Sequence, residues 1–274
     1  TAAAHGASLL NYAGVTSLHA PVSGSPRGLT FRDELTGVEH EVRARCIINA
    51  TGPFSDEVRR MDDPAQPPLM APSQGVHLVL PSRFLPGKAA LLVPHTRDGR
   101  VLFAIPWQGR TLIGTTDTPI ESPTPEPRPF PEEIDFRLET AGEYLDTRPQ
   151  REDVLSLFVG IRPLVGRSGR GRTSALSRDH LIEVSSGGLL TVTGGKWTTY
   201  RRMAEQAVDR AAALAGLPPR RCVTQDLCLH GWHEEASAFG HLAVYGAEAP
   251  ALQRLSGEHA DLEKPRHYDR PGRG

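Results

Sequence analysis

A turn with two glycines and a lysine is the strongest candidate for a ligand-binding site in this sequence. Gly194 and Gly195 follow an apolar run that predicts a strand, and Lys196 precedes a pattern that predicts a long helix. A helix start presents free N–H groups and partial positive charge, and Lys196 adds a full charge. The turn therefore suits a phosphate or the anionic edge of a reduced flavin ring. The alternative is a tight turn with Thr198 as the helix cap.

A second turn of small residues follows another predicted strand. Residues 44–50 form a nearly continuous apolar run, typical of a fully buried parallel strand, and Asn49, Ala50, Thr51 and Gly52 end it. Sites in α/β sheets lie beyond the carboxyl ends of strands, where small residues let the backbone approach a ligand. An ordinary strand-to-helix turn is the alternative interpretation.

Two arginines could bind an anion near these turns. Arg162 lies in an apolar segment, residues 160–164, and a buried guanidinium needs a partner. That partner is either a ligand carboxylate or phosphate, held bidentately, or an internal Asp. Arg178 stands next to Asp179, where a local ion pair is the simplest interpretation. If Arg162, Arg178 and Lys196 converge, they would select an anion of the size of a phosphate.

A metal site is not expected. Cys222, Cys228, His230 and His233 lie close together in the sequence, but their spacing fits no usual zinc module. The chain has 3 cysteines in all, an odd and sparse set that favours a reducing compartment over a disulfide framework.

The apolar periodicity predicts an α/β fold with an inserted antiparallel sheet. Alternating patterns on both sides of residues 34–37 predict a hairpin, and helices are predicted after Pro131 and over about 198–215, the second ending at Gly216. Position 130 is Phe, so the first of these helices lacks a good side-chain cap. Further strands are predicted at 9–12, 76–80, 89–93, 101–105, 111–115, 154–161, 180–184 and 189–193.

Charge and chain ends exclude some functions. The sequence has 31 basic and 32 acidic residues, so its net charge attracts neither nucleic acid nor an acidic membrane surface. No apolar run approaches the ~18 residues of a membrane-spanning helix. The chain does not begin with Met or with a signal peptide, and it opens within a pattern, so we expect it to be truncated at its front.

Taken together, these segments resemble the FAD-dependent glycerol-3-phosphate dehydrogenases, members of the D-amino-acid-oxidase-like superfamily. The order of GIRPL (160–164), SRDH (177–180) and GGKWTTYR (194–201) is more specific than any one motif, and the likeness covers most of residues 1–231. Trp197 stands where these enzymes usually have Leu. Further matching segments are 47–61, 72–81, 101–119 and 222–231.

The resemblance implies FAD as the cofactor and assigns roles to site residues. Arg162, Arg178 and Lys196 would face the substrate, and Arg162 and Arg178 would bind its phosphate or polarise its hydroxyl. His77 would line the pocket and is the first candidate to accept the hydroxyl proton, with Lys196 second. The residues that would contact FAD are Val15, Asn49, Ala50, Thr51, Gly52, Gly194, Gly195, Lys196, Trp197 and Thr198.

The implied reaction moves a hydride from C2 of sn-glycerol 3-phosphate to flavin N5, giving dihydroxyacetone phosphate, with electrons passed on to a membrane quinone. The implied location is cytoplasmic, with peripheral contact to the inner membrane in the parent protein. We predict that residues 1–58 and 156–218 belong to a partial Rossmann-like FAD-binding domain. Residues 59–155 would form an antiparallel-sheet substrate domain, and 219–274 a linker and the start of a truncated helical domain.

The sequence departs from the family pattern at its front. It contains no Gly-x-Gly-x-x-Gly after a strand, so the FAD-pyrophosphate loop is expected before Thr1 and the fragment alone is expected to be inactive. Two alternatives stay open: a flavin-dependent amine or amino-acid oxidase that uses Arg162 for a carboxylate, and a non-catalytic remnant.

Overall fold

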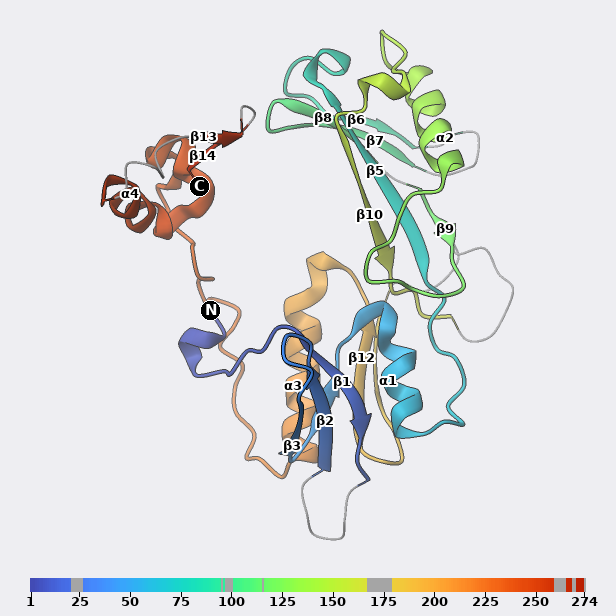
Figure 1. Ribbon diagram of the computed structural model, residues 1–274, viewed down its shortest axis with the longest axis vertical. Helices are drawn as coiled ribbons and strands as arrows, with labels where there is room; N and C mark the ends of the chain where they lie inside the picture. The colour runs from blue at the N-terminus through green and yellow to red at the C-terminus, as the bar shows by residue number, and fades with distance from the viewer. Residues whose placement is uncertain are drawn as a thin grey trace. The chain divides into compact units, whose positions relative to one another are not determined.

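The computed structural model describes residues 1–20, 27–94, 96, 101–114, 116–166, 179–258, 265–267 and 270–273. It divides the chain into two compact units, residues 12–220 and residues 1–11 with 221–274. The described residues of the larger unit form three sheets and three α-helices, most of whose elements are labelled in Figure 1. The two units are described separately, and the predicted finer boundaries at residues 58, 155 and 218 stay predictions.

One sheet of the larger unit has the strand order β11-β12-β4. β4 (Ile47–Asn49) pairs in parallel with β12 (Leu189–Gly194), which pairs antiparallel with β11 (His180–Val184). α3 (Tyr200–Leu214) packs against it through Ala207 and Ala211 on Leu190, and Gly216 follows in the left-handed conformation, as predicted. The prediction of a fully buried β4 is wrong, because Ile48 is 41% exposed between two buried neighbours.

The predicted hairpin is part of a three-stranded antiparallel sheet, β1 (Ala13–Leu18), β2 (Arg27–Asp33) and β3 (Glu39–Ala44). In the turn, the Asp33 carboxylate accepts hydrogen bonds from Leu35 N–H (2.9 Å) and Thr36 Oγ1 (2.7 Å). The strand predicted at 9–12 is wrong. Tyr12 has a φ of 53°, which interrupts extended backbone, and β1 begins only after it.

The third sheet of the larger unit is antiparallel and has the strand order β10-β5-β8-β7-β6. β9 also pairs with β5. This sheet includes β10, which the sequence analysis had placed in the returning segment 156–218; seven backbone pairings with β5 hold it here. A core of apolar side chains lies between the sheet and α2 (Pro131–Gly142). The strands are β5 (Ser73–Pro81), β6 (Leu91–Val93), β7 (Leu102–Trp107), β8 (Arg110–Gly114), β9 (Thr118–Pro119) and β10 (Ser156–Arg162).

The start of α2 is stabilised without a side-chain cap at Phe130, as the sequence indicated. Instead the buried Glu133 accepts a hydrogen bond from Phe130 N–H (2.9 Å). The same carboxylate accepts bonds from Gln74 (2.8 Å), Thr116 (3.0 Å) and Thr118 (2.5 Å). Glu133 therefore ties the helix to β5, to β9 and to Thr116.

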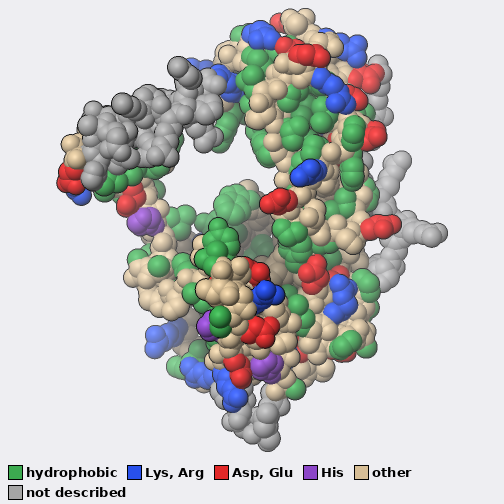
Figure 2. All heavy atoms as spheres, viewed as in Figure 1, with side chains coloured by type: hydrophobic (Ala, Val, Ile, Leu, Met, Phe, Trp, Pro, Cys, Tyr) green, Lys and Arg blue, Asp and Glu red, His purple; other side chains and the backbone are tan. Residues whose placement is uncertain are grey.

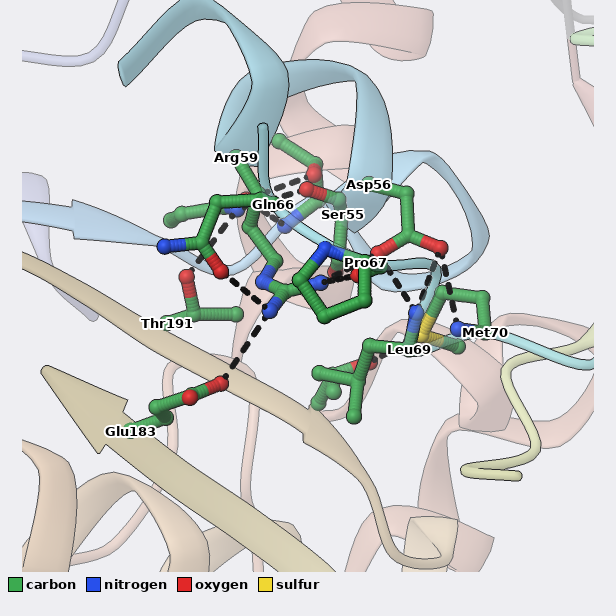
Figure 3. Close-up of polar contacts among 12 residues, drawn as sticks. Ser55, Asp56, Arg59, Gln66, Pro67, Leu69, Met70, Glu183 and Thr191 are labelled. Atoms are coloured by element: carbon green, nitrogen blue, oxygen red, sulfur yellow. Dashed lines mark hydrogen bonds and ion pairs between the residues drawn. The ribbon is translucent and has the colours of Figure 1, made fainter. Parts of the chain in front are cut away.

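A polar network fixes the segment that joins α1 (Ser55–Asp62) to β5, the first strand of the six-stranded antiparallel sheet (Figure 3). α1 contributes Asp56, whose carboxylate accepts hydrogen bonds from Leu69 N–H (3.0 Å), Met70 N–H (2.9 Å) and Arg59 (2.8 Å). Arg59 in turn donates to Pro67 O (2.9 Å) and Gln66 Oε1 (2.9 Å) and lies 3.4 Å from Glu183. The segment that leads into β5 is thus fixed against α1 and β11.

The smaller unit contains helices and a two-stranded sheet. It includes η1 (Ala3–His5), η7 (Ala236–Glu248), α4 (Ala249–Glu258), β13 (Pro265–His267) and β14 (Arg270–Arg273). Short 3-10 helices also occur in the larger unit: η2 (Gly52–Phe54), η3 (Ser82–Phe84), η4 (Arg151–Asp153) and η6 (Trp197–Thr199).

Charges of both signs lie on the surface of the described residues (Figure 2). On the face drawn in Figure 2, basic and acidic side chains are interspersed, in keeping with the net charge of −1. Within the described ranges, none of the helices combines the length and apolar character needed to cross a membrane.

Asp56→Ala should lower the free energy of unfolding by about 3 kcal/mol, because it leaves the largely buried Arg59 guanidinium and two backbone N–H groups without this acceptor. Urea unfolding measures the change. Glu57→Ala, an exposed position on the same helix, is the matched control and should change the midpoint little. Equal effects of the two substitutions would contradict the role given to Asp56.

Candidate active site at the ends of β4, β10 and β12

The two predicted small-residue turns lie at the same edge of a sheet. β4 and β12 are parallel, so their carboxyl ends meet, and Thr193 Oγ1 near the end of β12 lies 3.5 Å from Gly52 O. Segment 49–52 and segment 194–198 are thereby brought together. This edge is where an α/β sheet places a ligand.

Asn49 shapes the first turn with its side chain. Its amide, 2% exposed, donates to Ser55 O (3.0 Å) and Thr191 Oγ1 (3.3 Å), and its carbonyl accepts from Thr51 Oγ1 (2.7 Å). Ala50 and Thr51 are exposed. Gly52 has a φ of 58°, and a Cβ built on it would meet nothing within 4 Å. The turn therefore presents open backbone at the sheet edge.

The second turn requires both of its glycines. Gly194 and Gly195 have φ values of 76° and 72°, a region that favours glycine. A Cβ on Gly194 would lie 2.7 Å from Asp179 O, and one on Gly195 would lie 2.9 Å from Met203 Cε. Backbone conformation and close packing therefore exclude larger residues here.

The helix start differs from the alternative interpretation that made Thr198 its cap. η6 comes first, and it is Thr199 whose hydroxyl accepts from Lys196 N–H (3.1 Å), while α3 begins at Tyr200. Lys196, Trp197 and Thr198 are exposed. Trp197 is 86% exposed and stacks on Tyr200, with ring centroids 5.3 Å apart.

Arg162 lies at the end of β10, opposite Ser73 of β5. Its guanidinium is 3.6 Å from the carboxylate of Asp117, which also accepts a hydrogen bond from Ser73 Oγ. The internal Asp that the sequence left open as a partner therefore exists. Because the Arg162 side chain is still 32% exposed, it can also meet a ligand.

The residues that follow Arg162 come close in space to the glycine turn. Val165, three residues further on, has its Cγ2 3.1 Å from the position that a Cβ on Gly194 would take. Met70 bridges to Val165, and its sulfur lies 3.5 Å from Thr193 Oγ1. The end of β10 and the end of β12 are thus joined.

His77 lies in β5 directly opposite Phe158 of β10. The two rings stack with centroids 4.7 Å apart and planes 6° apart. Partial burial lowers the pKa of the His77 imidazole, and the positive charges of Arg162 and Arg137 lower it further. The shift favours the neutral imidazole, the form that can accept a proton.

Two other predicted residues have less structural context. Val15, in β1, pairs with Phe31 and is 37% exposed. Arg178 lies outside the described residues. The convergence of Arg162, Arg178 and Lys196 and the roles given to all the site residues stay predictions.

Asp117, Ser73 and Phe158 were missed by sequence reasoning. Asp117 follows two threonines in the matching segment 101–119, but no pattern within that segment couples it to Arg162. The ion pair between Asp117 and Arg162 forms because β9 and β10 both pair with β5. Only the order of strands in the sheet shows this.

The cysteine- and histidine-containing segment holds other contacts. Cys222 Sγ lies 3.1 Å from Thr224 Oγ1, and His230 Nε2 lies 3.4 Å from Glu248. Across the described part of the chain, no three His, Cys, Asp or Glu side chains are grouped to hold a metal ion.

An NMR titration should give the His77 imidazole a pKa below its ordinary value of 6.5. Arg162→Ala should raise that pKa, since removing a nearby positive charge makes protonation easier. Arg151→Ala, an exposed arginine paired with Asp135, is the control and should leave it unchanged. A pKa at or above 6.5 in the unsubstituted protein would contradict the described surroundings of His77.

Comparison with known proteins identifies the family of the chain. The family model described as FAD dependent oxidoreductase (DAO) matches residues 1–201. The probable mitochondrial glycerol-3-phosphate dehydrogenase of Caenorhabditis elegans is 43% identical over 267 residues, 95% of this chain and 37% of that protein. The mitochondrial glycerol-3-phosphate dehydrogenase of Arabidopsis thaliana is 46% identical over 249 residues, 89% of this chain and 39% of that protein.

A solved structure extends the likeness to three dimensions. The glycerol-3-phosphate dehydrogenase of Bacillus halodurans complexed with FAD superposes with a TM-score of 0.80 at 30% identity, covering 96% of this chain and 55% of that one. The chain thus spans well under two thirds of the length of these relatives. From the family match and the site geometry together, the chain belongs to the FAD-dependent oxidoreductases of the DAO family.

Proposed function

We propose that this chain forms the substrate pocket and part of the flavin site of an FAD-dependent glycerol-3-phosphate dehydrogenase, which oxidises sn-glycerol 3-phosphate to dihydroxyacetone phosphate. The observation that carries the proposal is that the partly exposed Arg162 and the stacked His77 imidazole lie on the same pair of strands, whose end is joined to the glycine turn. The names of the similar proteins from Caenorhabditis elegans, Arabidopsis thaliana and Bacillus halodurans support the substrate. Because the chain covers only part of these relatives, the activity belongs to the complete protein.

The residues at the sheet edge fit FAD. Asn49 holds a turn whose Gly52 leaves open space, and Gly194 and Gly195 permit close backbone approach beside Lys196. These segments would hold the cofactor's chain and its ring edge, respectively. When bound, FAD supplies the acceptor for the hydride that leaves the substrate carbon.

The polar side chains have complementary tasks in this proposal. Arg162 binds the phosphate or polarises the hydroxyl, and Asp117 fixes its guanidinium from one side. His77 accepts the hydroxyl proton as the carbinol is oxidised, with Lys196 as the second candidate. Arg178 is proposed as a further phosphate ligand.

Domain roles, electron acceptor and location complete the proposal. Residues 1–58 and 156–218 belong to the FAD-binding part, residues 59–155 to the substrate part, and residues 219–274 to a linker and a helical part. Electrons pass to a quinone rather than to oxygen, in a cytoplasmic protein with peripheral membrane contact. The two similar proteins from Caenorhabditis elegans and Arabidopsis thaliana are named mitochondrial, so cell fractionation decides the location. Quinone reduction compared with oxygen uptake decides the acceptor.

The complete reading frame that carries this chain should purify with flavin absorbance, and glycerol 3-phosphate should bleach it under anaerobic conditions. Glycine and sarcosine are the matched controls and should not bleach it. Bleaching by either amine instead would favour an amine oxidase, since Arg162 binds a carboxylate equally well. A flavin that none of the three reduces would favour a non-catalytic remnant.

In the complete enzyme, Arg162→Ala should lower kcat/KM by about a hundredfold or more, because both charge and hydrogen-bond donors leave the pocket. His77→Ala should lower kcat by about the same factor, as expected for loss of a general base. Steady-state kinetics measure both, with flavin content as the check on cofactor binding. Full turnover by His77→Ala would eliminate His77 as the proton acceptor.

A further inference from the structure

One face of the antiparallel sheet remains uncovered by α2. Along β5, Val76, Leu78 and Leu80 are fully buried in the core beneath that helix. The residues between them alternate to the opposite face, so His77 and Gly75 lie on the side away from α2. A pocket built on this second face has a β-sheet as its floor.

Three rows of paired residues cross β5 and β10 on this face. His77 lies opposite Phe158, Gly75 lies opposite Gly160, and Ser73 lies opposite Arg162. Directly opposed residues of antiparallel strands carry their side chains on the same face. The imidazole and the guanidinium therefore lie on either side of a row that has no side chains.

The glycine row leaves open space on its Gly160 side, while Gly75 is buried. A Cβ built on Gly160 would meet nothing within 4 Å, and Gly160 itself is exposed. Adjacent rows on this face are about 6.6 Å apart along a strand, so the His77 and Arg162 rows, with the glycine row between them, are about 13 Å apart at the backbone, which leaves room for a three-carbon phosphate ester between the two side chains. The charge of Arg162 acts on the His77 imidazole across this gap.

A third glycine fixes the imidazole at its end of the gap. Gly114, in β8 on the other side of β5, is buried, and a Cβ built on it would lie 2.5 Å from His77 Nε2. The ring is thus held between the stacked Phe158 ring and the Gly114 backbone. A fixed imidazole gives the gap a defined length.

We infer that the Gly75–Gly160 pair is the floor of the substrate pocket, and that the missing side chain at Gly160 sets which substrates fit between Arg162 and His77. The inference rests on the proposed function and adds a residue that determines specificity. It selects a small ester with an anionic group at one end and an oxidisable carbinol a few bonds away. Bulkier substrates would clash with the backbone of the Gly75–Gly160 pair.

Gly160→Ala in the complete flavin-loaded enzyme tests the floor. The added methyl group enters the pocket, and we expect the Kd for dihydroxyacetone phosphate, measured by calorimetry without turnover, and the KM for glycerol 3-phosphate to rise about tenfold or more. Flavin content and Tm should stay at the unsubstituted values, because the methyl group contacts no protein atom and the backbone is not in the left-handed region. Gly160→Val should raise both constants further.

Gly257→Ala in α4 is the matched control, since a Cβ there also meets nothing within 4 Å and its backbone is also unstrained. It should change neither constant. If Gly160→Ala binds product as the unsubstituted enzyme does, the floor is wrong while the proposed function stands. If Gly160→Ala lowers Tm below that of the unsubstituted enzyme, the space is not open and the inference is also overturned. An unsubstituted enzyme that binds neither compound would overturn both the floor and the proposed function.

Discussion

The contact between Asp56 and the backbone of residues 69 and 70 is the constraint on which the site depends. One carboxylate accepts from two consecutive N–H groups and from Arg59, and Arg59 holds the preceding loop at Pro67 and Gln66. A charged acceptor bound by several donors is worth more than the same number of neutral bonds. Because residues 69 and 70 lead into β5, this contact determines where the face that carries His77 begins relative to the turns at Gly52 and Gly194.

A second buried ion pair secures the opposite end of the α/β layer. Arg27, at the start of β2, donates to Asp62 at the end of α1 and to Gly187 O in the turn between β11 and β12, and both charged side chains are less than a tenth exposed. Removing either partner would leave a buried charge, which is costly. The hairpin sheet, α1 and the β11–β12 turn are therefore held together away from the site, leaving the carboxyl edge of the sheet free for ligand.

The sequence predicted much of the fold because local patterns determine it. The alternation at β2 and β3, the proline at the start of α2 and the glycine after α3 each act within a few residues. It failed at Tyr12, whose positive φ has no signal in a Leu-Leu-Asn-Tyr run. It also did not show which sheet β10 joins, because that depends on pairing with a strand about 80 residues away. The two glycine turns could be found from sequence, but the partners of Arg162 and His77 could not, since Asp117, Ser73 and Phe158 reach them only across strands.

Trp197 makes the glycine turn accessible to fluorescence spectroscopy. Its indole is 86% in contact with solvent, more than Trp107 or Trp232 at 59% each, and it rests against the Tyr200 ring at the start of α3. Indole emission moves to longer wavelength in water and to shorter wavelength when water is removed. A molecule that covers this end of the helix therefore shifts the emission wavelength of the protein's tryptophan fluorescence. Binding at the turn can then be followed without an added label.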